Sequence, residues 1–135
     1  MSINFKISNM NKGVFLVGLF LTVILSCKPQ KTEVNNITID NLQVVLQNEN
    51  NAQLLDVRTP EEWSRGVIEN PIKIDVTGND FEGKALEKLD KTKPVYLYCR
   101  SGGRSLKASE LLAQKGFKVY NVLGGYLEWT EKNKE

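Results

Sequence analysis

At 135 residues, of which 41% are hydrophobic and 25% charged, the chain has the size and composition of a single globular domain. Residues 1–26 contain Lys6 and Lys12 but no acidic side chain, so the net charge of +2 leaves a neutral remainder, which argues against a nucleic-acid binder. The absence of histidine excludes Ser-His-Asp and Cys-His hydrolases and Cys/His zinc sites, and we expect no metal and no cofactor.

Residues 1–26 have the layout of a signal peptide. A polar segment with two lysines precedes 13 residues without a charge, 13–25, and a small residue, Ser26, follows. The apolar run is shorter than the roughly 20 residues that a membrane-spanning helix needs. The alternative is an N-terminal membrane anchor in which the following cysteine has no role.

The sequence Ile-Leu-Ser-Cys at 24–27 resembles the lipobox of bacterial lipoproteins, with Leu25 as a less common residue at its position. The resemblance implies that Cys27 is lipidated and becomes the first residue after cleavage. Residues 27–36 are polar and contain a proline, as in a short tether. The expected location is the bacterial cell envelope, outside the cytoplasm, with the protein anchored to a membrane through several acyl chains.

The rest of the chain alternates between helical and extended patterns. Asp40 is predicted to cap the first helix, which has apolar residues at helical spacing, and Thr59 with Pro60 is predicted to open the second. Helices are predicted over residues 39–50, 59–66, 79–90, 104–116 and 126–133, and strands over 52–58, 71–76, 94–99 and 118–125. This alternation predicts an α/β domain with a parallel sheet covered on both faces. The Gly124-Gly125 pair is interpreted as a turn.

Cys99 lies at the carboxyl end of the strongest predicted strand, where open α/β sheets place their active sites. The loop from Cys99 to Ser105 (CRSGGRS) leads into a helix, so its backbone N–H groups and the helix N-terminus can surround an anion. A thiolate there would be stabilised without a general base. Gly102 and Gly103 allow the loop to curl around the sulfur, and Ser105 could cap the helix. Arg104 opposes the helix dipole and is therefore predicted to have an anionic partner.

Several motifs together resemble a single-domain rhodanese, a thiosulfate-type sulfurtransferase: LLDVRTPEEW (54–63), GVI (66–68), YLYCRSGGRS (96–105) and GFKVYNVLGGYLEW (116–129). The resemblance implies a rhodanese-like domain over residues 37–133, with a five-stranded parallel sheet and helices on both faces.

In that family the loop cysteine takes a sulfur atom from a donor, holds it as a persulfide and passes it to cyanide or a thiol. The resemblance makes Cys99 the persulfide carrier, with a small sulfur-containing anion as donor. We expect the protein to be a monomer. Asp56 and Arg58 are implied as structural support. The implied substrate-binding residues are Arg100, Ser101, Gly102, Gly103, Arg104 and Ser105, with the two arginines attracting the donor.

Two other functions remain open. Related phosphatases and arsenate reductases resemble C-x5-R, whereas four residues separate Cys99 from Arg104 here, a smaller ring that suits a single added sulfur atom. A non-catalytic rhodanese module that binds a partner or senses sulfur or oxidants is the second, in which case Cys99 could be an inert buried thiol. The segment GVIENP (66–71) departs from the family's G-H-I-x-G-A, with Val67 in place of histidine.

Overall fold

A computed structural model of the chain describes residues 32–134. The predicted signal peptide, Cys27 and the first part of the tether lie outside these residues. Within them, no helix is long and apolar enough to cross a membrane.

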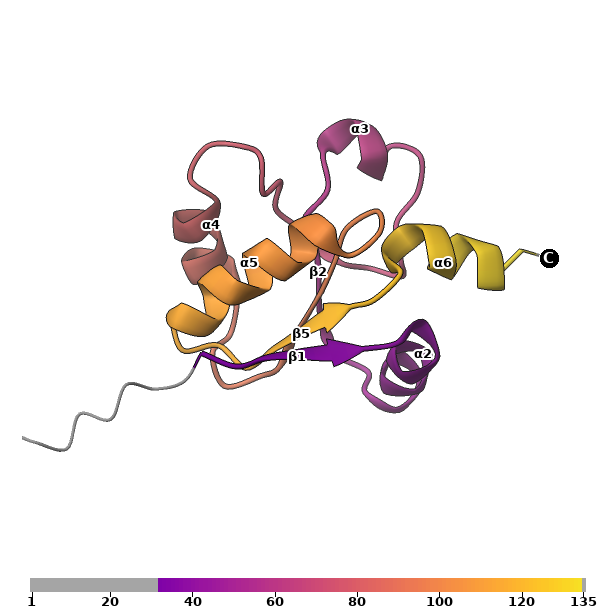
Figure 1. The fold of residues 1–135 in the computed structure, drawn as a ribbon, viewed down its shortest axis with the longest axis horizontal. Helices are drawn as coiled ribbons and strands as arrows, with labels where there is room; N and C mark the ends of the chain where they lie inside the picture. Colours follow the sequence, from indigo (N-terminus) through magenta and orange to yellow (C-terminus); the bar gives the residue numbers. More distant parts are fainter. Residues whose placement is uncertain (1–31, 135) are drawn as a thin grey trace, which may run out of the picture. The chain divides into compact units, whose positions relative to one another are not determined.

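A five-stranded sheet forms the centre of the domain, with the strand order β1-β5-β4-β2-β3 and every pair parallel. This confirms the predicted α/β class (Figure 1). The elements in chain order are β1 (Val34–Ile37), α2 (Ile39–Asn48), β2 (Gln53–Asp56), α3 (Pro60–Trp63), β3 (Ile72–Lys73), α4 (Phe81–Lys88), β4 (Val95–Tyr98), α5 (Gly103–Gln114), β5 (Val119–Val122) and α6 (Gly125–Lys132).

Helices cover both faces of the sheet, as predicted. Alternate residues of each strand point to opposite faces, so Leu55 and Leu97 pack with α4 and α5, whereas Leu54 and Tyr96 pack with α2 and α6. Residues of the central strands β2 and β4 are buried throughout. A parallel sheet covered on both faces requires such continuous burial, which explains the apolar runs in the sequence.

β1 was not predicted. Its residues Val34–Ile37 pair in register with Val119–Val122 of β5. Residues 34–36 were predicted to belong to the tether, but they form part of the sheet. The sequence VNNI has two asparagines and little strand propensity, and the backbone pairing with β5 is what makes it a strand.

The N-terminal caps of α2 and α3 can be compared with the predicted ones. Thr38, not Asp40, caps α2, with its Oγ accepting from the Asn41 N–H at 3.2 Å, so that prediction was wrong. The predicted cap of α3 is confirmed: Thr59 and Glu62 form a reciprocal capping box. α3 nevertheless ends at Trp63, earlier than predicted.

Candidate active site

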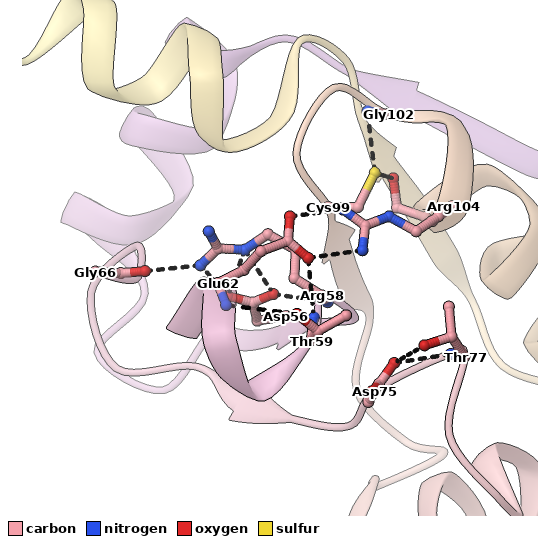
Figure 2. Close-up of polar contacts among 11 residues, drawn as sticks. Asp56, Arg58, Thr59, Glu62, Gly66, Asp75, Thr77, Cys99, Gly102 and Arg104 are labelled. Atoms are coloured by element: carbon pink, nitrogen blue, oxygen red, sulfur yellow. Dashed lines mark hydrogen bonds and ion pairs between the residues drawn. The ribbon is translucent and has the colours of Figure 1, made fainter. Parts of the chain in front are cut away.

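The loop after β4 curls around the sulfur atom of Cys99. Asp56 of β2 pairs in register with Tyr98 of β4, so the two chain segments that follow these strands leave the sheet side by side. Gly102 precedes α5 with φ of +104°, a left-handed conformation that residues with a Cβ rarely adopt. This turn directs the loop back over Cys99, as Figure 2 shows.

Gly102 and Ser105 place hydrogen-bond donors next to the Cys99 sulfur. The Gly102 N–H donates to Sγ at 3.1 Å (Figure 2). The Ser105 Oγ lies 3.4 Å from the same atom. Ser105 is fully buried and makes no capping bond to α5, so the predicted cap was wrong and its hydroxyl instead faces the sulfur. Ser101 and Gly103, the other predicted loop residues, are exposed at the surface.

The environment of Cys99 favours the thiolate. Burial by itself raises the pKa of the Cys99 thiol. Hydrogen bonds from the Ser105 hydroxyl and from the N–H groups of Ser105, Gly102 and Ser101 outweigh burial, and the pKa is lowered from its ordinary value. The loop therefore has the geometry and the electrostatics of a site that holds an anionic sulfur.

Arg104 has an anionic partner within the chain. Its guanidinium donates two hydrogen bonds of 2.7 Å to the carboxylate of Glu62, the same residue that completes the capping box of α3 (Figure 2). The hydrogen bonds from Arg104 hold the pKa of Glu62 down at about 2, so the pair stays ionised at neutral pH. Arg104 thus ties the loop to α3, and Arg100 is left as the arginine of the loop that faces solvent.

Asp56 and Arg58 form a buried ion pair behind the loop. The Arg58 Nη2 lies 2.6 Å from Asp56 Oδ2, and the two side chains are 2% and 0% exposed. Arg58 also donates to the Gly66 carbonyl at 2.7 Å and lies 4.0 Å above the Tyr126 ring. The pair fixes the turn after β2 to the segment that follows α3 and to α6.

The Gly124-Gly125 pair does more than make a turn. The N–H groups of Tyr126 and Leu127 donate to the carbonyls of Cys99 and Arg100 at 2.9 and 3.0 Å. A Cβ at position 125 would lie 2.5 Å from the Cys99 carbonyl oxygen, and Gly125 has φ of +56°. The start of α6 therefore holds the backbone of the loop at Cys99 and Arg100. This role could not be predicted from the two glycines in the sequence.

We expect Gly125→Ala to lower kcat/KM for any reaction that depends on the Cys99 thiolate by at least about tenfold. The left-handed conformation costs roughly 1–2 kcal/mol with a Cβ, and the overlap with the loop carbonyls displaces Cys99. Gly78→Ala is the matched control, because Gly78 has no positive φ and its new Cβ would meet neighbours at 3.4 Å or more. Equal activity of the two variants would contradict this role of Gly125.

The domain is similar to known proteins in both sequence and structure. Residues 41–132 match the family model of the Rhodanese-like domain. A protein of Allochromatium vinosum named sulfurtransferase is 32% identical over 97 residues, which cover 71% of this chain and 88% of that protein. Thiosulfate sulfurtransferase 18 of Arabidopsis thaliana is 31% identical over 119 residues, which cover 79% and 86%. The crystal structure of a rhodanese-like domain protein from Staphylococcus aureus is 34% identical, with a TM-score of 0.66 over 75% of this chain and 96% of that chain.

Proposed function

This chain belongs to the rhodanese-like family, and we propose that it is a sulfurtransferase that carries a sulfane sulfur as a persulfide on Cys99. The observation that carries the proposal is the position of Sγ beneath the Gly102 N–H and beside the Ser105 hydroxyl, in a site that lowers the thiol pKa. Relatives named sulfurtransferase support the same activity.

The proposed reaction has two steps at one sulfur atom. The Cys99 thiolate attacks the outer sulfur of thiosulfate, an S–S bond forms to Cys99, and the S–S bond of the donor breaks with release of sulfite. Cyanide or a thiolate then attacks the outer sulfur of the persulfide, and Cys99 leaves as the thiolate. Both steps use the stabilised thiolate, first as nucleophile and then as leaving group, so the loop serves both.

The transfer of a sulfur atom to Cys99 is tested by intact-mass spectrometry of the full chain after incubation with thiosulfate. We expect a gain of one sulfur atom, about 32 Da, that cyanide removes as thiocyanate. Cys27→Ser should gain the same mass, which assigns the atom to Cys99 because the chain has two cysteines. No adduct with thiosulfate or with an organic persulfide would favour a non-catalytic module.

We propose that the anionic donor binds in a pocket beside the loop. Its volume is about 160 Å³, and it is lined by Arg58, Glu62, Arg65, Arg100, Tyr126 and Leu127. Arg58 is neutralised by Asp56, and Glu62 by Arg104. Arg65 and Arg100 have no ion-pair partner among residues 32–134, so the pocket is positively charged.

We expect Arg100→Ala to raise KM for thiosulfate by about tenfold with little change in kcat, because one charge-assisted contact to the anion is lost. Lys84→Ala on α4 is the control for the loss of one positive charge elsewhere on the surface. If KM for thiosulfate is the same in the wild type and Arg100→Ala, Arg100 has no part in binding the donor.

We also propose that Cys27 is lipidated and anchors the domain outside the cytoplasm of a bacterial cell. Support comes from the apolar run 13–25 and from the lipobox-like sequence that ends at Cys27. In bacteria that express the chain, radiolabelled palmitate should enter the wild type and be absent from Cys27→Ala, with Cys99→Ala labelled as strongly as the wild type. Label retained in Cys27→Ala would disprove this anchor.

A further inference from the structure

The Ser105 hydroxyl lies between two acceptors but has one proton to donate. Its Oγ is 2.6 Å from Asn121 Oδ1 and 3.4 Å from Cys99 Sγ. Ser105 is fully buried and Asn121 is 2% exposed, so bulk water does not supply the missing hydrogen bond. Donation to the sulfur therefore requires the hydroxyl to give up its bond to Asn121.

The shorter of the two distances shows which atom accepts the Ser105 proton in the structure. A separation of 2.6 Å fits an O–H···O hydrogen bond, which spans about 2.5–3.0 Å, and is short for an N–H···O bond. The Asn121 carbonyl oxygen thus accepts from Ser105. The other end of the carboxamide is held as well, because Nδ2 donates to Asn36 Oδ1 of β1 at 3.4 Å.

We propose that Asn121 is a positioning residue that holds the Ser105 proton away from Cys99 until the sulfur becomes negatively charged. When the thiol loses its proton to solvent, the Ser105 O–H turns from Asn121 to Sγ, and it turns back when the thiol is protonated again. The thiolate gains one hydrogen bond in this exchange and Asn121 loses one. Asn121 thereby limits how far the loop stabilises the thiolate. The proposal rests on the proposed function, since it concerns the same sulfur atom.

The charged groups around the loop are the same in every variant of the test described below. Arg100 and Arg104 come from the loop and α5, Glu62 from α3, and Asp75 from the segment after β3. α6 contributes Tyr126 through its backbone N–H to the Cys99 carbonyl. β1 and β5 contribute only the neutral Asn36 and Asn121 to this network.

The test is a pH titration of the Cys99 thiolate by its ultraviolet absorbance, in the full chain with Cys27→Ser so that one thiol remains. Ser105→Ala should raise the pKa of Cys99 by roughly one unit, because the thiolate loses a donor. Asn121→Val removes the competing acceptor and should lower the pKa by a similar amount. In the Ser105→Ala background, Asn121→Val should have no effect, since the positioned hydroxyl is gone.

A second readout separates positioning from a structural role. Below the pKa, Asn121→Val should react with iodoacetamide about threefold faster than its parent, because a tenfold gain in thiolate is partly offset by lower nucleophilicity. A variant that only loosens the fold would lower the melting temperature without shifting the titration in this direction.

Asn36→Ala keeps the test valid if Asn121→Val fails to fold. Asn36 is exposed on the edge strand β1, and its removal frees the Asn121 carboxamide to rotate, so the pKa of Cys99 should fall by a smaller amount. Asn35→Ala is the matched control on the same strand, because Asn35 donates to the Val119 carbonyl and not to Asn121.

The proposal is overturned if neither Asn121→Val nor Asn36→Ala lowers the pKa, or if Asn121→Val acts equally in the presence and absence of the Ser105 hydroxyl. These titrations do not require sulfur transfer. A wild type that fails to load sulfur would therefore disprove the proposed function while the result on Asn121 stands.

Discussion

Cys99→Ser should abolish thiosulfate-dependent thiocyanate formation, with a loss of at least about a thousandfold, the scale on which enzymes lose activity with their nucleophile. A serine hydroxyl at this position stays protonated at neutral pH and cannot hold a persulfide. The change of sulfur to oxygen leaves the Gly102 N–H and the Ser105 hydroxyl with an acceptor, so the fold should be retained.

The measurement is turnover with thiosulfate and cyanide, together with the melting temperature and the intact mass of the same sample. The melting temperature should stay close to that of the wild type, which shows that the loss is chemical. A Cys99→Ser protein that still gains one sulfur atom and forms thiocyanate would place the sulfur carrier elsewhere in the chain.

Asp56→Asn should reduce the free energy of unfolding by about 3–5 kcal/mol, which is a large part of the stability of a small domain. The substitution keeps the shape of the side chain but leaves the Arg58 guanidinium, 2% exposed, without its counter-charge. Arg58 would also be held less firmly against the Gly66 carbonyl and the Tyr126 ring, so activity should fall along with stability.

Denaturant unfolding measures this effect, and the chain offers a matched control. Asp40→Asn makes the same chemical change in an exposed ion pair with Lys132 and should leave the unfolding midpoint nearly unchanged. The double variant Asp56→Leu/Arg58→Met should be more stable than Asp56→Asn, because no unpaired charge remains buried. Equal unfolding midpoints for Asp56→Asn and Asp40→Asn would contradict the structural role of the Asp56–Arg58 pair.

The fold could be predicted because apolar runs and helical spacing alternate along the chain, and that alternation admits few arrangements other than a covered parallel sheet. The edge strand β1 escaped prediction, since VNNI becomes a strand through pairing with β5, 85 residues away at Val34 and Val119. The cap of α2 was misplaced because Thr38 and Asp40 are both good capping residues. The full burial of Ile39 in the first turn decides between them in the folded protein.

The site was predicted to the extent that its chemistry is local. Cys99 and the glycine turn are adjacent in sequence, and their relation to a helix start follows from the pattern. The sequence predicted that Arg104 has an anionic partner. It did not show that the partner is Glu62, because the two residues lie 42 positions apart in the sequence. The role of Asn121 could not be predicted from its place in an apolar strand. It depends on the contact between its carboxamide and the Ser105 hydroxyl, which only the folded structure shows.

A pH titration of the Cys99 thiol in the full chain with Cys27→Ser shows whether the loop holds the sulfur of Cys99 as an anion. If the hydrogen-bond donors of the loop outweigh burial, the pKa of Cys99 lies below the value of an unperturbed thiol. A pKa at or above that value would show that burial outweighs the donors of the loop, and would contradict the account.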